Sequence, residues 1–302
     1  MKNNVQVLLK NRKNCGEKMK KITLLDGAMG TYLEKKGYKG ITPELACVES
    51  PDLIEQIHRE YVESGAEIIL TNTFGANRYR LGKKNIADKF ELINKKAIEI
   101  AEKVKREKNI QIAGDIGPSG ELLYPYGTMK EKDCEELFIN QGKFYSGKVD
   151  IIVLETFTDL SELKIAYSSL KKISSVPVVP CLSFQIGKEY RTMMGNRIED
   201  YIDWAEKENV EFIGTNCGVG SEQMKEIVER IGKLTDKQLW VKPNAGIPQL
   251  LNNKVIYPES KEEFVENCIY MCENFNVKFI GGCCGTEPSY IKLLREKLYE
   301  NS

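Results

Sequence analysis

Three of the nine cysteines stand in glycine-rich stretches that directly follow apolar runs. Cys217 lies in the sequence Thr-Asn-Cys-Gly, and Cys283 and Cys284 are adjacent in Gly-Gly-Cys-Cys-Gly. Glycines at these positions leave the cysteines uncovered, and a disulfide between adjacent cysteines would need a strained ring. Thiolates are preferred ligands of soft or borderline ions, of which Zn²⁺ is the usual one. We therefore interpret Cys217, Cys283 and Cys284 as the ligands of one zinc ion per chain.

Three protein ligands leave one position of a tetrahedral zinc ion open, which is typical of a catalytic site. Three thiolates also make the site negatively charged, so that it generates hydroxide poorly. It still binds an incoming thiol and removes the proton of that thiol at neutral pH. The bound sulfur remains nucleophilic. The predicted chemistry is therefore attack of a substrate sulfur on an electrophilic carbon.

Eight short apolar runs, each followed by a turn and an amphipathic helical pattern, predict the elements that position these cysteines. The predicted strands are Ile22–Leu25, Ile68–Leu70, Ile110–Ala113, Ile151–Leu154, Val176–Leu182, Phe212–Ile213, Leu239–Val241 and Lys278–Ile280. The predicted helices cover roughly residues 52–64, 88–107, 131–147, 160–174, 198–208, 221–234, 261–274 and 288–299. Apolar strands that alternate with helices indicate a covered parallel sheet, and eight such units favour a closed barrel. We expect an α/β fold of the (β/α)8 TIM-barrel type, as a single domain over residues 22–302 after a short N-terminal extension, residues 1–21.

Each predicted strand ends in a polar or glycine-rich sequence. Asp26 opens such a sequence after the first strand, and Glu155 does so after the fourth. In an α/β barrel all C-terminal strand ends meet on one face, which is where active sites lie. Cys217 ends the sixth strand and the cysteine pair ends the eighth, so their side chains can reach one ion across the rim. We expect all eight strand ends to form one site.

The composition excludes several classes of function. Lys plus Arg and Asp plus Glu number 44 each, so the formal net charge is zero and no nucleic-acid surface is expected. No apolar run approaches the roughly 20 residues needed to span a membrane, and no secretory signal is apparent. Nine cysteines without such a signal indicate the reducing cytoplasm. The single histidine, His58, is read as a packed or surface residue, which disfavours catalytic triads and histidine metal sites. Cys268 and Cys272 are read as one apolar helix face.

Seven motifs together resemble the homocysteine S-methyltransferase family, most closely the homocysteine-binding barrel of cobalamin-dependent methionine synthase. They are LLDGAMGT, TNTFGANRYRL, GDIGPSGELLYPYG, ETFTDLSELK, GTNCG, KPNAG and GGCCGT, in the family's order from about Ile22 to Leu298. The resemblance implies a (β/α)8 fold, zinc on Cys217, Cys283 and Cys284, homocysteine as the thiol substrate, and methionine as the product.

The resemblance also implies roles for residues around the metal. Asp26 and Glu155 match the family's acids that hold the substrate's amino group, and two carboxylates at strand ends complement an ammonium. Backbone amides around Gly27, Ala28 and Thr73 are expected to take the substrate's carboxylate, as glycine-rich turns do. Asn216 and Asn244 are weaker candidates for supporting groups.

The resemblance does not identify the methyl donor. The chain lacks the D-x-H-x-x-G loop that binds cobalamin, so cobalamin is not expected on this chain itself. We favour a separate corrinoid- or folate-binding protein as the methyl source. One alternative is a sulfonium or betaine, such as S-methylmethionine, with no corrinoid partner. Two others are a non-catalytic homocysteine- or zinc-binding module of a larger complex, and an unrelated barrel enzyme with a structural zinc.

Overall fold

The computed structural model describes residues 21–251 and 254–299. The predicted N-terminal extension therefore lies outside the described residues, except for Lys21. Eight parallel strands form the central sheet: β1 (Thr23–Leu24), β2 (Ile68–Leu70), β3 (Gln111–Ile116), β4 (Ile151–Phe157), β5 (Val178–Leu182), β6 (Phe212–Gly220), β7 (Gln238–Asn244) and β10 (Val277–Ile280). They are hydrogen-bonded in the order β1-β10-β7-β6-β5-β4-β3-β2.

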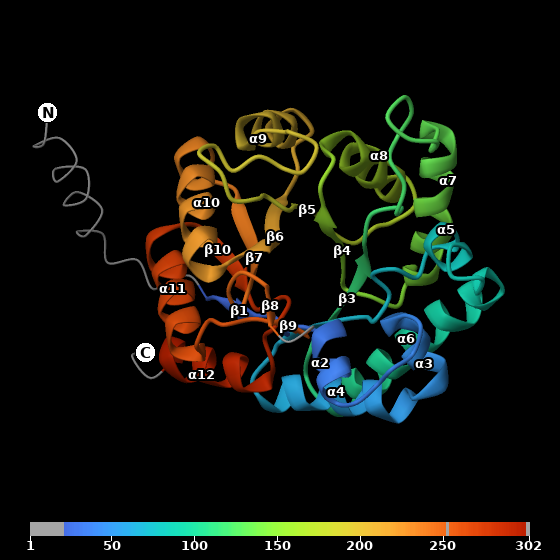
Figure 1. Ribbon diagram of the computed structural model, residues 1–302, viewed down its shortest axis with the longest axis horizontal. Helices are drawn as coiled ribbons and strands as arrows, with labels where there is room; N and C mark the ends of the chain where they lie inside the picture. Colours follow the sequence, from blue (N-terminus) through green and yellow to red (C-terminus); the bar gives the residue numbers. More distant parts are fainter. Residues whose placement is uncertain (1–20, 252–253, 300–302) are drawn as a thin grey trace, which may run out of the picture.

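The sheet closes on itself between β1 and β2. Leu25 forms a parallel bridge with Ile68, and the Asp26 N–H donates to the Ile68 carbonyl at 3.1 Å. Viewed along the barrel, the strands form an inner ring that is surrounded by helices (Figure 1). The predicted (β/α)8 barrel is therefore confirmed, and each predicted strand is present in the described part of the chain.

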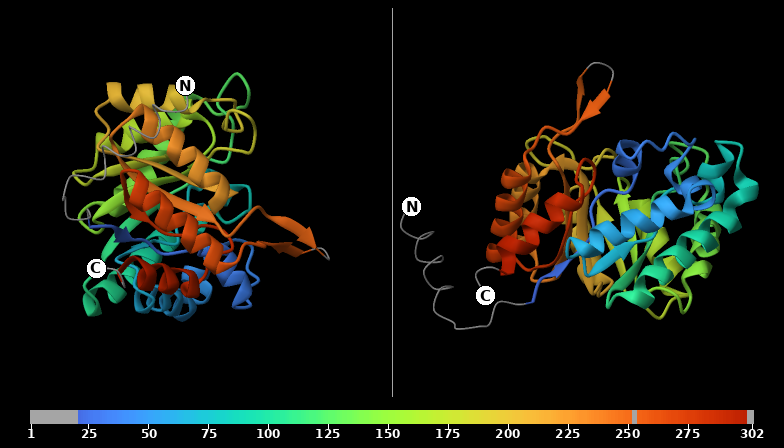
Figure 2. Two further views of the ribbon diagram at one scale, coloured as in Figure 1. Left: turned by 90° about the vertical axis from the view of Figure 1, so that its left-hand side faces the viewer. Right: turned by 90° about the horizontal axis from the view of Figure 1, so that it is seen from below.

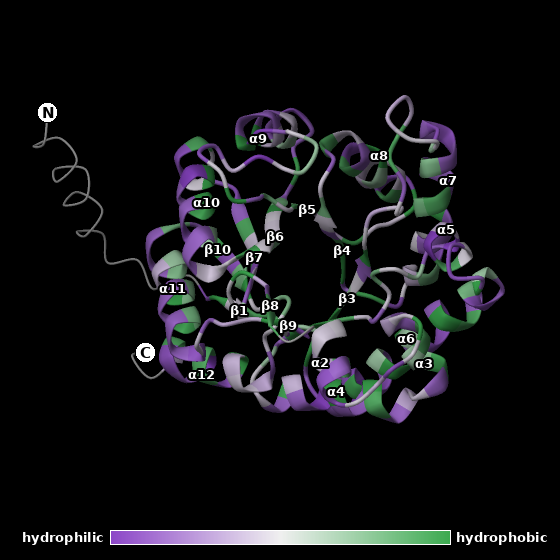
Figure 3. Ribbon diagram, viewed as in Figure 1, coloured by the Kyte–Doolittle hydropathy of each residue, from purple (hydrophilic) through white to green (hydrophobic). Residues whose placement is uncertain are grey.

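The helices follow the strands along the chain. The longer helices are α4 (Pro51–Glu63), α6 (Phe90–Glu107), α7 (Glu131–Gly142), α8 (Leu160–Lys171), α9 (Ile198–Lys207), α10 (Ser221–Leu234), α11 (Lys261–Asn274) and α12 (Pro288–Tyr299). Short helices lie in the loops: α2 (Gly30–Lys35), α3 (Ala46–Glu49) and α5 (Arg78–Gly82), with single turns at Pro43–Leu45, Ala87–Lys89 and Lys143–Tyr145. Figure 3 shows polar and apolar stretches on the same outer helices, as expected for helices with one buried face.

Alternation along each strand separates two cores. On β4, Ile151 and Val153 point into the barrel, where they pack with Trp240, whereas Ile152 and Leu154 pack beneath the helices. Trp240 is completely buried and its ring lies 5.1 Å from that of Phe279. Side chains thus fill the lower half of the barrel, as in other barrels of this type.

A hairpin after β7 is the main element that the sequence did not predict. Strands β8 (Gln249–Leu251) and β9 (Lys254–Ile256) pair antiparallel and project from the barrel (Figure 2). Leu250 and Val255 on this hairpin are 74% and 61% exposed. The side chains of this hairpin do not enter the core. The segment therefore has only a short apolar pattern, which did not predict a strand. None of the helices among the described residues is both long and apolar enough to cross a membrane.

Candidate metal and substrate site

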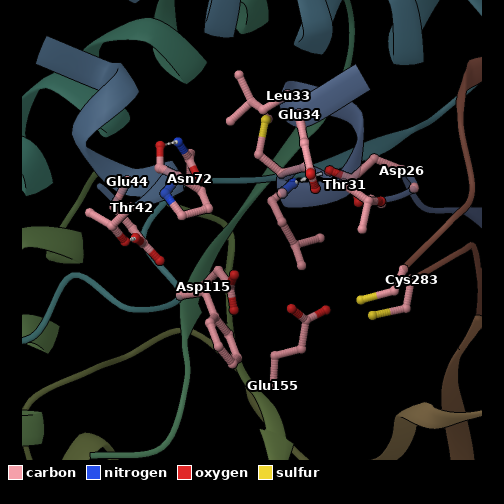
Figure 4. A pocket seen from close by; sticks show the side chains of 18 of the residues that line it. Asp26, Thr31, Leu33, Glu34, Thr42, Glu44, Asn72, Asp115, Glu155 and Cys283 are labelled. Carbon is pink, nitrogen blue, oxygen red and sulfur yellow. Dashed lines mark hydrogen bonds between the residues drawn. The ribbon is translucent and has the colours of Figure 1, made fainter. Parts of the chain in front are cut away.

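A cavity of about 690 Å³ opens at the C-terminal ends of the barrel strands. Residues at the ends of β1, β2, β3, β4, β6, β7 and β10 line it, together with α2 and the segment from Tyr38 to Glu44. The ends of seven of the eight strands therefore converge on one cavity, whereas the end of β5 is not among the residues that line it. Figure 4 shows Asp26, Asp115, Glu155 and Cys283 around one space.

Cys217, Cys283 and Cys284 come together on one wall of this cavity. Their sulfur atoms all lie within 4.8 Å of one another, and the Sγ atoms of Cys217 and Cys284 are 3.9 Å apart. Tetrahedral ligands with S–metal bonds of about 2.3 Å stand about 3.8 Å apart. In residues 21–251 and 254–299, this is the only group of three or more Cys, His, Asp or Glu side chains with ligand atoms this close. The donor set and its spacing therefore fit a tetrahedral zinc ion with three protein ligands.

The backbone of β6 is distorted at Cys217, one of the three candidate metal ligands. The pairing of β6 with β7 shifts register between Asn216 and Gly220, and Cys217 has a φ of 56°. Gly218 follows with a φ of 74°, and a Cβ there would stand 2.5 Å from the Phe184 carbonyl oxygen. A bulge of this kind re-aims a side chain away from the regular alternation, and such strain is typical of functional sites. The bulge directs the Cys217 thiol towards the cysteines of the neighbouring loop.

The loop after β10 is fixed to the loop after β1. The Gly282 N–H donates to the Asp26 carbonyl at 3.0 Å, and the Ala28 N–H donates to Thr286 Oγ1 at 3.2 Å. A Cβ on Gly281 would stand 2.5 Å from the Asp26 carbonyl oxygen, so only glycine permits this approach. The cysteine pair is therefore held against the acidic end of the cavity.

The three thiols also interact with polar neighbours. Contact with Cys217 and Cys283 lowers the pKa of the Cys284 thiol, to which the Tyr257 hydroxyl also hydrogen-bonds. Asn216 Nδ2 donates to Thr156 Oγ1 at 2.7 Å and lies 3.9 Å from Cys283 Sγ. Asn216 thus ties β6 to β4 beside the cysteines, and its supporting role stays a prediction.

Lys242 connects the acids at the floor of the cavity. Its ammonium donates to Asp26 Oδ1 at 2.9 Å and lies 3.5 Å from Glu155 Oε1. Asp26 Oδ2 accepts the Leu70 N–H at 2.7 Å. Both oxygens of Asp26 therefore have partners within the protein. Burial raises the pKa of the Asp26 carboxyl, and the charge of Lys242 opposes that rise.

Glu155 and Asp115 have fewer partners. Burial raises the pKa of Glu155 to about 7, although Lys242 opposes this shift. Burial, reinforced by the charge of Glu155, raises the pKa of Asp115 well above its usual value. Asp115 Oδ1 is buried and has no hydrogen-bond partner, and the same holds for Asn244 Oδ1. The cavity floor therefore offers polar atoms that a ligand can satisfy.

Lys242, Asp115 and Tyr257 are site residues that sequence reasoning missed. Asp115 and Lys242 stand two positions after inward-facing residues of their strands, Ala113 on β3 and Trp240 on β7. The period of two along a strand was thus the signal that could have identified both. Tyr257 follows the unpredicted hairpin, and no pattern around it marks its proximity to Cys284.

Of the three residues expected to bind the substrate carboxylate, two line the cavity and one does not. Gly27 and Ala28 line the cavity, and the Ala28 N–H donates to Thr286 Oγ1. Their predicted role stays a prediction. Thr73 is completely buried outside the cavity lining, and its N–H donates to the Thr71 carbonyl at 2.8 Å. Its amide is therefore hydrogen-bonded within the protein, and its predicted role stays a prediction. The Thr73 hydroxyl supports the backbone of Asp115, because it donates to the Asp115 carbonyl at 2.8 Å.

Two residue readings outside the site can also be compared with the structure. His58 is completely buried in α4, and burial lowers the pKa of its imidazole to about 4. It is thus a packed residue, and it is not part of any metal-type cluster among the described residues. Cys268 and Cys272 pack in the core between helices and barrel, in agreement with the apolar-face reading.

Comparison with known proteins points to one family. Residues 23–298 match the sequence profile of the homocysteine S-methyltransferase family. Methionine synthase of Mycobacterium leprae (strain TN) is 30% identical over 286 residues, which cover 88% of this chain and 23% of that protein. The methionine synthase of Mycobacterium tuberculosis (strain ATCC 25618 / H37Rv) is also 30% identical, with 88% of this chain and 24% of that protein covered. The chain spans about a quarter of the length of these curated relatives.

Solved structures give the same barrel. The homocysteine methyltransferase MmuM from Escherichia coli, in its metallated form, superposes with a TM-score of 0.75 at 20% identity and covers 98% of this chain and 100% of its own. Its oxidized form gives a TM-score of 0.71 at 22% identity, with 98% and 99% of the two chains covered. At this identity the likeness establishes the fold. Because the family profile covers almost the whole chain, the chain belongs to the homocysteine S-methyltransferase family.

Proposed function

We propose that this chain is a zinc-dependent homocysteine S-methyltransferase that converts homocysteine to methionine. The observation that carries the proposal is that a cluster of thiols and a cluster of buried carboxyl groups line the same cavity. Three thiols within 4.8 Å of one another stand on one wall, and buried carboxyl groups stand on the floor. Homocysteine has a thiol at one end and an ammonium at the other, so it complements both.

When bound, a zinc ion on Cys217, Cys283 and Cys284 would bind the substrate thiol and lower its pKa, so that the sulfur becomes nucleophilic. The remaining steps belong to the protein's own residues. The acidic floor around Glu155 binds the ammonium of homocysteine and thereby orients its sulfur towards the cysteines. Asn216 keeps Cys283 in place through its bond to Thr156. Preorganisation of this kind lowers the barrier because the sulfur is already positioned for attack.

For the methyl donor, we propose methylcobalamin or a methylated folate that reaches the site on a separate protein, with no corrinoid bound by this chain. The similarity to methionine synthases supports this donor, since the chain matches about a quarter of those longer proteins.

A specific observation supports a second candidate, a small sulfonium or betaine donor. The cavity of about 690 Å³ lies in the range that holds a drug-sized ligand. It therefore has room for a small donor beside homocysteine. Its lining is partly apolar and includes Met29, Leu33 and Phe74.

Turnover by the purified, zinc-loaded chain tests these proposals. Homocysteine is incubated with methylcobalamin, S-methylmethionine or betaine, and methionine is quantified by mass spectrometry. The proposed function predicts methionine with at least one donor, and the donor that works selects between the two candidates. Tight binding of zinc and homocysteine without turnover, even with a corrinoid protein supplied, would instead favour a non-catalytic binding module.

A further inference from the structure

We propose that Thr156 is a positioning residue for the metal site, which it holds through a side-chain bridge to Asn216. The bridge passes over the end of β5 and fixes the distorted part of β6 that carries Cys217. This inference rests on the proposed function, because it concerns the arrangement of the thiols proposed to hold the zinc ion. Thr156 acts through Asn216 and is not itself a metal ligand.

Strands β4 and β6 are both distorted near their C-terminal ends. The pairing of β4 with β5 shifts register between Leu154 and Phe157, and Thr156 within this step has a φ of 60°. Cys217 lies in the corresponding step of β6, with a φ of 56°. For a β-branched residue such as threonine a positive φ is a genuine outlier, so the surrounding structure must hold Thr156 in this conformation.

The distortion of β4 turns Thr156 towards the site. Thr156 lines the cavity directly after Glu155, although successive residues of a regular strand face opposite sides. Phe157, the next residue, packs in the core beneath the helices. The strained backbone therefore places the Thr156 hydroxyl on the cavity side of the barrel.

The side chain of Asn216 joins the two distorted strands. Its Oδ1 accepts the Thr156 N–H at 2.8 Å, and its Nδ2 donates to Thr156 Oγ1 at 2.7 Å. Asn216 is completely buried, and hydrogen bonds are electrostatically stronger in such surroundings than in water. Two bonds thus fasten the left-handed Thr156 to the residue that precedes Cys217.

This bridge crosses β5, which lies between β4 and β6 in the sheet. Leu182, at the end of β5, pairs with Phe157 on one side and with Thr215 on the other, next to the two bridging residues. The bridge therefore lies over the end of β5. This position accounts for the cavity lining, which includes the ends of β4 and β6 but not that of β5.

Asn216 connects the bridge to the thiols. Its Nδ2 lies 3.9 Å from Cys283 Sγ, and Cys217 follows it directly in the chain. Loss of the Thr156 hydroxyl would remove one of the two bonds that hold this amide, and the thiols would be less well arranged for one ion. Residues that orient metal ligands in this way commonly change metal affinity about 10- to 100-fold when they are mutated.

The test measures zinc affinity by competition with a chelator for wild type, Thr156→Val, Asn216→Ala and the double variant. Thr156→Val removes the hydroxyl but keeps the size and branching of the side chain. Thr156→Ser keeps the hydroxyl, and Thr158→Val makes the matched change two residues on, outside the cavity lining. The absorption spectrum of each cobalt-substituted chain reports sulfur–metal coordination, and urea unfolding of the metal-free chains reports stability.

We expect Thr156→Val to weaken zinc binding about 10-fold and to alter the sulfur-to-cobalt charge-transfer bands. Thr156→Ser and Thr158→Val should stay within about twofold of wild type and keep its cobalt spectrum. In the Asn216→Ala background, Thr156→Val should cause no further loss of zinc affinity, because its partner is already gone. Unchanged zinc affinity in Thr156→Val, or losses that simply add in the double variant, would overturn the proposal.

A merely structural role for Thr156 would lower the stability of the metal-free variant and leave its zinc affinity and cobalt spectrum as in wild type. That outcome also overturns the proposal. Should Thr156→Val not fold, Thr156→Ala removes the same hydroxyl with less bulk at the strained backbone. Failure of the proposed function is distinguishable, because it shows in the wild type itself, as a chain that binds zinc but forms no methionine. A wild type that binds no zinc would overturn both.

Discussion

At the scale of single residues, the proposed function depends most on the three cysteines. We predict that Cys283→Ser abolishes zinc binding while the barrel stays folded, because a hydroxyl is a poor substitute for a thiolate at a soft site. Cys272→Ser is the matched control, since Cys272 lies in the core outside the site. Zinc content by atomic spectroscopy and the far-UV circular dichroism spectrum check both variants. A zinc-replete Cys283→Ser protein would defeat the metal assignment.

Lys242 makes a second residue-scale prediction, which concerns stability. Lys242 is 2% exposed and Asp26 is 3% exposed, and their charged atoms are 2.9 Å apart. Removal of one partner of such a buried pair costs about 3–5 kcal/mol, because the other charge is left uncompensated. Lys242→Met should therefore lower the free energy of unfolding in urea by that amount. Adding Asp26→Asn should restore part of the loss, and simple additivity of the two changes would contradict a direct pair.

The raised pKa of Glu155, about 7, predicts how substrate selection depends on pH. As pH falls through about 7, Glu155 takes up a proton and no longer attracts an ammonium. A thiol without the amino group, 4-sulfanylbutanoate, is the reference ligand. The preference for homocysteine over this analogue should therefore decrease between about pH 8 and about pH 6, by up to about tenfold per unit. The ratio of the two affinities removes the contribution of the thiol proton. Glu155→Gln should make the ratio independent of pH, and an equally steep profile in that variant would exclude Glu155 as the titrating group.

The raised pKa of Glu155 affects the free energy of unfolding in the opposite direction to substrate binding. Because the folded state holds the Glu155 proton up to about pH 7, this group's contribution to the free energy of unfolding is full below its ordinary pKa. The contribution is lost as pH rises through about 7. Glu155 therefore favours substrate binding and disfavours folding in the same pH range, as expected of a buried functional acid.

Residue types alone predicted which three cysteines come together, but not all of the acids beside them. Cys217, Cys283 and Cys284 were identifiable because thiols beside glycines at strand ends are poorly suited to core packing and well suited to metal binding. The role of Asp26 was harder to predict from the sequence. Its ion pair with Lys242 depends on which side chains point into the barrel at the same level. That level is set by the stagger between β1 and β7, which sequence does not reveal.

At the scale of elements, the bulge in β6 is the feature that positions Cys217. Gly218 permits it, with a φ of 74° and no space for a Cβ beside Phe184 and Ser183. We predict that Gly218→Ala lowers zinc affinity and destabilises the fold by about 1–3 kcal/mol, since it adds a clash to a strained backbone. Zinc affinity measured by competition with a chelator tests the first effect, and urea unfolding tests the second.

Gly147→Ala provides the control for this prediction. Gly147 also has a positive φ, 69°, but a Cβ there would meet nothing within 4 Å. It should cost about 1 kcal/mol from the backbone conformation alone and leave zinc affinity unchanged. If the two variants retained zinc equally, the bulge would not be what positions the metal ligand.

The elements also show where sequence patterns are sufficient. Eight apolar runs located eight strands because parallel barrel strands are covered on both faces and are therefore continuously apolar. The hairpin β8–β9 was not predicted because its residues remain exposed. Without a buried face, the segment shows no alternation of apolar and polar residues. The register shift in β6 also escaped, since a bulge depends on pairing with β7 and leaves no periodicity of its own.

At the scale of the whole molecule, barrel closure turns separated segments into one site. Cys217 and Cys284 are 67 positions apart in the chain, and Asp26 and Lys242 are 216 apart, yet each pair is in contact. The described fold thus places three clustered thiols beside an acidic floor. The family membership and this geometry support the same function, activation of the homocysteine thiol.

Counting zinc ions and protons on the purified wild-type chain tests this thiol activation without any methyl donor. Zinc content is determined after purification without chelators, and homocysteine is then titrated in buffers of different ionisation enthalpy. We predict one zinc ion per chain and the release of about one proton for each homocysteine bound, because the thiol is bound as a thiolate. A metal-free chain, or homocysteine binding without proton release, would contradict zinc-dependent activation of the thiol.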